Sequence, residues 1–183
     1  MINIKTFKNL NLNEQDDARS LIKEIFYLSS SVKSFDSEDR KQSFFMKWCG
    51  NYLEKYPDFF YLAFTEDQQL LGYLSGSINS RECLEVLNVP GMSLFSDCFD
   101  EFPAHLHINF HPDARGKGLG TMLVNHFIKD CKKLKIGGLH LITSPDAKNV
   151  GFYKRLNFIK EIVRLQNENE LLFMGQKLND SAL

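Results

Sequence analysis

The feature that most constrains the fold is a strand that runs directly into a glycine-rich turn and then into an amphipathic helix. The alternating segment 106–110 precedes Gly116, Gly118 and Gly120, which occupy every second position. A helix N-terminus carries unpaired N–H groups and the positive end of the helix dipole, and glycine lets an anion approach the backbone closely. The segment therefore predicts a phosphate-binding site between a strand and a helix of an α/β fold.

The spacing of the glycines excludes two common phosphate loops. A dinucleotide-binding fold requires Gly-x-Gly-x-x-Gly, whereas this chain has Gly-x-Gly-x-Gly from Gly116 to Gly120. A P-loop requires four residues between its glycines and then Gly-Lys-Ser/Thr, but Lys117 lies between the first two glycines. The pattern that remains is Arg-x-x-Gly-x-Gly, formed by Arg115, Gly118 and Gly120. A plain surface turn is the alternative explanation for the three glycines.

A second informative segment runs from Asn149 to Phe158 and begins 28 residues after Thr121. It reads Asn-Val-Gly-Phe-Tyr-Lys-Arg-Leu-Asn-Phe and predicts a short helix. Asn157 stands where a left-handed residue would end that helix. Asn tolerates this conformation best after Gly, so we expect the turn to form.

Together the two segments resemble the two signatures of the GNAT superfamily of acetyl-CoA-dependent N-acetyltransferases. The resemblance is close over residues 104–164 and rests elsewhere on element order. It implies a single GNAT-like domain over residues 1–183, in the α/β (α+β) class, with a mixed, mostly antiparallel sheet of about six or seven strands and about four helices. The run Pro-Ala-His-Leu-His-Ile at 103–108 is similar to a subgroup that includes the acetyltransferase-like module of some O-GlcNAc hydrolases.

The resemblance implies acetyl-CoA as co-substrate, with the glycine loop holding its pyrophosphate through backbone N–H groups. Arg115 would order the loop or add charge. The free backbone of the strand end would pair with the pantetheine arm, and an N–H near Phe110 would polarise the thioester carbonyl. The implied CoA-binding residues are Asn109, Phe110, His111, Arg115, Gly116, Lys117, Gly118, Leu119, Gly120, Thr121, Asn149 and Phe152.

Tyr153 matches the position at which many superfamily members place the acid that reprotonates the leaving thiolate. A phenol with a pKa of ~10 donates to a thiolate of pKa ~8.5 only at close range in a dry site. The alternative is an aromatic ring that only packs against the CoA arm.

The general base is predicted on the strand over residues 104–110, the expected central strand of the sheet. His105, His107 and Asn109 share one face of this strand. His107 is the candidate, and its variant should lose most activity below neutral pH if it titrates near the ~6.5 of free imidazole. Asp100 and Glu101 compete with it for the role. Alternatively, both histidines are hydrogen-bonded polar residues beside the acceptor cleft, without a role in catalysis. Subgroup members often carry Asp at the position of Asn109, and an amide cannot act as a base.

The predicted function is acetyl transfer from acetyl-CoA to a primary amine by direct attack in a ternary complex. The acceptor is a small molecule or a peptide amine. The alternative is a non-catalytic acyl-CoA-binding sensor or interaction module with the same fold. The net charge of −1 gives no case for a nucleic-acid surface. We expect no metal, because no third ligand accompanies the His-x-His strand.

The cysteine pattern and the hydropathy indicate a cytoplasmic protein without a membrane segment. None of the four cysteines forms a Cys-x-x-Cys pair, and no apolar run approaches the ~20 residues of a membrane helix. We expect a monomer or a homodimer.

Periodicity and turn residues predict the elements along the chain. We expect an Asn13 cap on the first helix, an Asp36 or Ser37 cap on the second, and Leu119, Met122, Leu123, Phe127, Cys131 and Leu134 on the buried face of the third. Residues 78–103 resist assignment and either shape the acceptor site or pack loosely. The expected strands are 2–7, 59–64, 70–77, 104–110, 138–142, 158–165 and 170–176, and the expected helices are 14–27, 38–56, 118–134 and 147–156.

Overall fold

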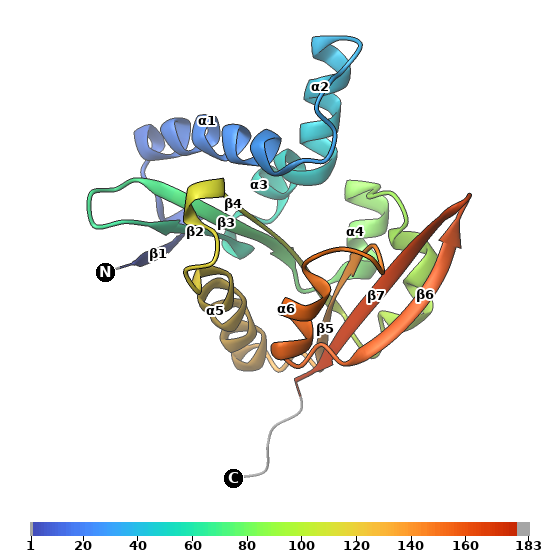
Figure 1. The fold of residues 1–183 in the computed structure, drawn as a ribbon. Coiled ribbons are helices and arrows are strands. Elements are labelled where there is room, and N and C mark those ends of the chain that lie inside the picture. The colour runs from blue at the N-terminus through green and yellow to red at the C-terminus, as the bar shows by residue number, and fades with distance from the viewer. Residues whose placement is uncertain (1, 179–183) are drawn as a thin grey trace. The chain divides into compact units, whose positions relative to one another are not determined.

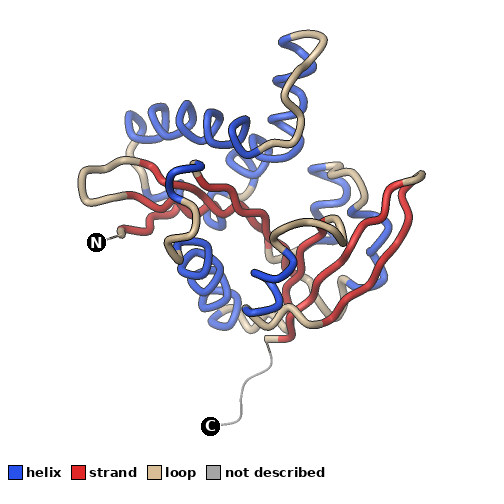
Figure 2. Tube along the Cα trace, in the orientation of Figure 1, coloured by secondary structure: helices blue, strands red, loops and turns tan. Residues whose placement is uncertain are grey.

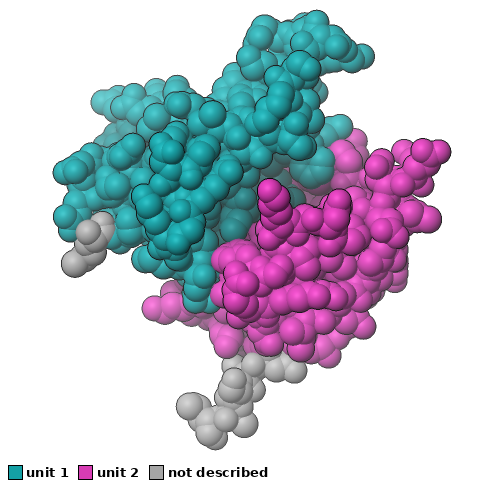
Figure 3. Space-filling model, viewed as in Figure 1, with its two compact units in different colours: residues 1–76, 107–126 teal, residues 77–106, 127–183 magenta. Residues whose placement is uncertain are grey.

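The structure is a computed structural model that describes residues 2–178. Seven strands are hydrogen-bonded in the order β1-β2-β3-β4-β5-β7-β6, and helices accompany them (Figure 1). This mixed sheet confirms the predicted α/β class. The chain forms two compact units, residues 1–76 with 107–126 and residues 77–106 with 127–183 (Figure 3). The single domain over 1–183 stays a prediction.

The strands of the first unit form an antiparallel ladder. β1 (Asn3–Thr6) pairs with β2 (Phe60–Phe64), and β2 pairs with β3 (Leu70–Ser77), so the two expected strands form a hairpin. All five residues of β2 are buried, which explains why its sequence is apolar without alternation. The end of β4 (Ala104–Phe110) follows β3, since the His111 N–H donates to the Leu71 carbonyl at 2.9 Å.

The first long helix, α1 (Leu12–Ser29), begins earlier than its sequence pattern suggests. The Asn11 side chain accepts from the Glu14 N–H at 3.0 Å, and the Glu14 carboxylate accepts from the Asn11 N–H at 2.8 Å. This reciprocal capping box satisfies two helix-end donors at once. The predicted Asn13 cap is therefore wrong by two residues. The short helix η1 (Phe7–Asn9) connects β1 to α1.

The predicted helix over 38–56 contains a π-helical segment. It consists of α2 (Glu38–Phe45), the π segment η2 (Met46–Gly50) and α3 (Asn51–Lys55), followed by η3 (Pro57–Phe59). Ser37 is its cap, accepting from the Arg40 N–H at 3.2 Å. A π segment inserts an extra residue into a helix, is rare and often marks a functional site.

The second unit is built around β7 (Asn169–Lys177), which lies between β5 (Gly138–Thr143) and β6 (Lys160–Gln166) (Figure 2). β7 pairs antiparallel with both of these strands. β4 runs parallel to β5 at the pairs Ala104–Leu139 and His105–His140. Phe102 and Phe173 are almost fully buried, with ring centroids 5.6 Å apart. The last two expected strands thus form a hairpin, β6 with β7.

Residues 78–103, which the sequence left unassigned, are largely helical. They form α4 (Ser80–Leu87) and the 3-10 helix η4 (Met92–Cys98), with Phe95 fully buried. The Arg164 guanidinium holds this segment by two hydrogen bonds to Asp97, at 2.6 and 2.7 Å. This segment is therefore packed and not loose.

The remaining helices are η5 (Pro112–Ala114), α5 (Leu119–Lys133) and α6 (Val150–Arg155). Met122 and Leu134 are 42% and 51% exposed, so their predicted inward placement is wrong. Met122 lies about 100° around the helix from Leu123, and Leu134 follows the last helical residue. The buried face of α5 consists of Leu119, Leu123, Val124, Phe127 and Cys131. All four cysteines of the chain are buried, and none forms a disulfide.

Candidate functional site

The glycine loop presents an open stretch of backbone at the start of α5. Gly116 and Gly118 have φ angles of +74° and +78°, a region that favours glycine. A Cβ added at either position would meet no atom within 4 Å apart from those of the glycine and its two chain neighbours. The loop is thus shaped by backbone conformation and leaves room for an anion. Gly116, Lys117 and Gly118 are exposed, Gly120 and Thr121 are half-buried in the first turn of α5, and Leu119 is buried.

Arg115 is bound to the strand end that precedes the loop. Its Nε and Nη2 donate to the Phe110 carbonyl at 3.3 and 3.2 Å, and Nη2 also donates to Ser29 Oγ at 3.2 Å. Ser29 Oγ donates to the same carbonyl at 3.2 Å. The guanidinium therefore fixes the geometry between β4 and the loop. Ser29, at the end of α1, was not predicted, because only the tertiary fold brings it to Phe110.

This arrangement allows a test of what Arg115 contributes. We expect Arg115→Lys to weaken acetyl-CoA binding about as much as Arg115→Ala, by roughly five- to twentyfold, because a lysine cannot make the forked contact. If Arg115 acted by charge alone, Arg115→Lys would keep most of the affinity. Isothermal titration calorimetry of both variants with acetyl-CoA distinguishes these outcomes.

At the end of β4, one backbone N–H group, that of Phe110, is directed away from β3. The His111 N–H is bound to Leu71, and the His111 carbonyl accepts from the Ala114 N–H at 2.9 Å. Successive residues of a strand direct their backbone groups to opposite sides. The Phe110 N–H therefore points away from β3, on the side where its carbonyl meets Arg115 and Ser29.

The two histidines of β4 have different surroundings. His105 is 2% exposed, and its Nδ1 lies 2.8 Å from Ser80 Oγ, which itself donates to the Pro103 carbonyl at 2.7 Å. His105 is thus a satisfied buried residue, as one of the two alternatives expected. His107 is half-buried, and its ring contacts Trp48 and Tyr52 with centroids 6.2 and 5.7 Å apart.

The expected titration of His107 near neutral pH is wrong. Burial disfavours the charged imidazolium and lowers the pKa of His107 to about 4. His107 is therefore neutral at physiological pH. A neutral imidazole can accept a proton, but one with so low a pKa is a weak base.

The competing acids are engaged in surface ion pairs. Asp100 accepts from Arg81 at 2.7 Å, and its side chain is 86% exposed. Glu101 pairs with Lys177 at 2.7 Å, and this contact lowers the pKa of the Glu101 carboxyl. A lowered pKa weakens Glu101 as a base. Asn109, the third member of the β4 face, donates from Nδ2 to Tyr73 Oη at 2.9 Å.

The second signature forms α6 in the second unit. Tyr153 is 3% exposed, and its ring contacts Phe152 and Phe158 with centroids 5.0 and 5.5 Å apart. Burial raises the pKa of Tyr153, so its phenol keeps its proton. The Asn149 side chain accepts from Thr143 Oγ1 at 3.2 Å.

The turn after α6 has the expected conformation. Asn157 has a φ of +68°, and the Phe158 N–H donates to the Tyr153 carbonyl at 3.1 Å. The prediction that Asn replaces the usual glycine here without loss of the turn is confirmed.

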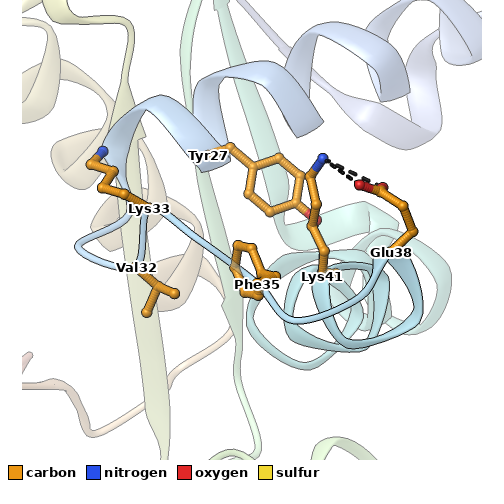
Figure 4. A pocket seen from close by; sticks show the side chains of 6 residues that line it. All are labelled: Tyr27, Val32, Lys33, Phe35, Glu38 and Lys41. Atoms are coloured by element: carbon orange, nitrogen blue, oxygen red, sulfur yellow. Dashed lines mark hydrogen bonds and ion pairs between the residues drawn. The ribbon is translucent and has the colours of Figure 1, made fainter.

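A cavity in the first unit lies between the end of α1 and α2 (Figure 4). The Tyr27 hydroxyl donates to the Lys41 carbonyl at 2.7 Å, and the Lys41 ammonium pairs with Glu38 at 3.2 Å. None of the predicted site residues lines this cavity, and Glu38 and Lys41 neutralise each other. Its lining residues are Tyr27, Val32, Lys33, Phe35, Glu38 and Lys41.

Residues 2–178 contain neither a cluster of metal-ligating side chains nor a membrane-spanning helix. No group of three or more His, Cys, Asp or Glu side chains in this range could hold a metal ion. Within the same range, no helix is long and apolar enough to cross a membrane.

Comparison with known proteins identifies one family, that of the GNAT acetyltransferases. A family model described as the acetyltransferase (GNAT) family matches residues 17–158. The uncharacterized N-acetyltransferase ycf52 of Pyropia yezoensis is 39% identical over 51 residues, which are 28% of each chain, so the match spans about a quarter of that relative.

Solved structures share the fold at low sequence identity. The crystal structure of SsHAT superposes with a TM-score of 0.74 at 17% identity, covering 98% of this chain and 99% of that one. The structure of yncA, a putative acetyltransferase from Salmonella typhimurium with its cofactor acetyl-CoA, gives a TM-score of 0.59 at 17% identity, covering 100% and 97%.

Proposed function

This chain belongs to the acetyltransferase (GNAT) family, and from that premise we propose that it transfers an acetyl group from acetyl-CoA to a primary amine by direct attack in a ternary complex. The observation that carries the proposal is the glycine loop, whose Gly116 and Gly118 adopt positive φ angles and leave open space above the backbone. The space that an added Cβ would occupy is where the loop can receive a pyrophosphate.

Acetyl-CoA supplies a thioester carbonyl, which the amine nitrogen attacks as the carbon–sulfur bond breaks. Residues 116–121 would hold the pyrophosphate through backbone N–H groups and the helix dipole. The Phe110 N–H would donate to the carbonyl oxygen, where negative charge develops. Arg115 and Ser29 would keep that N–H in place by fixing the Phe110 carbonyl.

Two side chains would move protons in this reaction. Tyr153 would give its phenolic proton to the leaving thiolate and recover one from water. Its role rests on its place in the second signature; the buried phenol, whose pKa is raised, carries the proton it would donate. His107 would take the proton that the attacking nitrogen loses, through a bridging water. Asn149 and Phe152 would lie against the CoA arm.

The state of His107 leads to a prediction about pH. Because its pKa is about 4, the imidazole is already neutral throughout the physiological range and protonates only in acid. A weak base cannot deprotonate an ammonium, so the amine must arrive neutral. We expect kcat/KM to rise with pH toward the acceptor's own pKa, ~10 for an alkylamine, without an inflection near 6.5.

The matching variant is His107→Ala. It should lower kcat by roughly ten- to a hundredfold, by about the same factor at pH 6 as at pH 8, with the acetyl-CoA affinity unchanged. Initial rates over this range would check it. A loss that is small at pH 6 and grows toward pH 8 would contradict the lowered pKa, because a base with a pKa near 6.5 is already protonated and inactive in acid.

The alternative function is a non-catalytic acyl-CoA-binding sensor. One observation favours it, namely that Asn109 carries an amide where subgroup members often carry a carboxylate. Release of CoA thiol distinguishes the two functions. An acetyltransferase releases thiol faster when a suitable amine is present, whereas a sensor binds acetyl-CoA without turnover. The four amines to be tested are spermidine, glucosamine, tyramine and a lysine-containing peptide.

A further inference from the structure

The side chain of Asn109 is hydrogen-bonded to a buried tyrosine. Asn109 Nδ2 donates to Tyr73 Oη at 2.9 Å, across the neighbouring strands β4 and β3. Asn109 is half-buried, whereas Tyr73 is only 1% exposed. The amide nitrogen of a half-buried residue is therefore bound to a group of the protein interior.

Tyr73 is itself fixed on two sides. Its ring stacks on Phe60, with centroids 5.1 Å apart and planes 23° from parallel. Its hydroxyl is hydrogen-bonded to the thiol of Cys49, a fully buried residue of the π segment η2. Burial raises the pKa of Cys49 to about 12 and also raises the pKa of Tyr73. Both groups keep their protons, and the three side chains form a neutral network.

The direction of this network determines what Asn109 can offer. An Asn side chain has two N–H donors and one carbonyl acceptor. Because the nitrogen is bound to Tyr73, Oδ1 is the atom of the amide group that can accept a hydrogen bond from a further group. An amide oxygen accepts a hydrogen bond but does not take up a proton. Asn109 can orient an N–H or O–H group without serving as a base.

The π segment connects this network to the other polar residue of the strand face. Trp48 and Cys49 are consecutive residues of η2, and Trp48 contacts His107 while Cys49 contacts Tyr73. His107 and Asn109 lie two residues apart on one face of β4. One irregular turn of helix thus supports both residues, in keeping with the frequent location of π segments at functional sites.

We infer that Tyr73 is a positioning residue, which holds the Asn109 amide so that its Oδ1 accepts a hydrogen bond from the attacking nucleophile. This inference rests on the proposed function, because the nucleophile is the acceptor amine or, without an amine, water. Asn109 orients the nitrogen or oxygen that forms the new bond, and His107 takes its proton. Tyr73 touches neither substrate and acts through Asn109.

The test compares single and double variants by release of CoA thiol from acetyl-CoA, with water alone and with the four amines as nucleophiles. Tyr73→Phe removes only the hydroxyl and should lower kcat about five- to fiftyfold, while the acetyl-CoA Kd stays within about twofold. The double variant Tyr73→Phe/Asn109→Ala should be no slower than Asn109→Ala, because both changes break the same contact. Asn109→Asp should retain activity and make the rate depend on pH, since a carboxylate accepts from the Tyr73 hydroxyl and titrates.

A matched control removes a buried hydroxyl elsewhere. Tyr61 of β2 is 1% exposed, and its ring contacts His126. Tyr61→Phe should leave kcat unchanged, even if it lowers the melting temperature. If Tyr73→Phe does not fold, Cys49→Ala and Cys49→Ser replace it in the test. Cys49→Ala should lower kcat about two- to fivefold, and Cys49→Ser should restore it by keeping a hydrogen bond to Tyr73.

The outcomes separate the inference from the function on which it rests. A wild-type protein that binds acetyl-CoA but releases no thiol with water or with any amine would overturn the proposed function. Wild-type turnover that Tyr73→Phe leaves unchanged, or losses that simply multiply in the double variant, would overturn the inference alone.

Discussion

Replacing Gly118 by valine should weaken acetyl-CoA binding by about a hundredfold or more and leave the fold intact. Gly118 has a φ of +78°, a conformation that costs a non-glycine residue about 1–2 kcal/mol and a β-branched residue more. The new side chain would also stand in the open space that is proposed for the pyrophosphate. Both effects act on the loop, because no atom beyond Gly118 and its two chain neighbours lies within 4 Å of the added Cβ.

The matched control is Gly137→Val. Gly137 also has open space around an added Cβ, but it lies outside the loop and has no positive φ. It should bind acetyl-CoA with the wild-type affinity. Calorimetry with acetyl-CoA, together with circular dichroism of each variant, makes the comparison. If the folded Gly118→Val protein bound acetyl-CoA with unchanged affinity, the glycine loop would not be part of the binding site.

Replacing Tyr153 by phenylalanine should lower kcat by roughly ten- to a thousandfold with little change in acetyl-CoA affinity. The variant keeps the ring contacts with Phe152 and Phe158 and removes only the hydroxyl. Burial raises the pKa of Tyr153, so the wild-type phenol is protonated at neutral pH but is a weaker acid than a free tyrosine, and it donates only to a thiolate formed at close range.

The comparison variant for Tyr153 is Tyr153→Leu, which removes both the hydroxyl and the ring. If the hydroxyl is the acid, the two variants should share the same loss of kcat, and only Tyr153→Leu should also lose stability. Steady-state kinetics and thermal melts provide both quantities. If Tyr153→Phe kept the full turnover rate, Tyr153 would serve only as a packing residue and not as the acid.

Local patterns predicted the part of the fold that carries the proposed site. The bounds of β4 are those expected from its alternation, and the left-handed Asn157 follows from the tolerance of Asn for that conformation. Such features depend on a few neighbouring residues. They are therefore readable from sequence without any knowledge of tertiary contacts.

The features that sequence reasoning missed depend on contacts between distant segments. Ser29 meets Phe110 across 81 residues, and Tyr73 meets Asn109 across 36. The π segment η2 continues the periodicity of a helix closely enough that the pattern predicts a plain helix. Gly50 at its end is one visible signal, since an added Cβ there would lie 2.5 Å from Met46 Sδ.

The pKa of His107 shows why chemistry was harder to predict than fold. The alternation of β4 placed His107 correctly on one face with Asn109, but it gave no information about what covers that face. Trp48 and Tyr52 pack against the ring, and this burial disfavours the charged form. A residue chosen for its titration near neutral pH is thus neutral there.

The most direct test of acetyl transfer measures both products of one reaction. Purified protein is mixed with acetyl-CoA and each of the four amines, and free CoA thiol and acetylated amine are quantified in the same samples. We predict that at least one amine yields the two products in equal amounts, at a rate that Tyr153→Phe lowers. Saturable binding of acetyl-CoA without acetylation of any amine would contradict the account and identify the chain as a CoA-binding sensor.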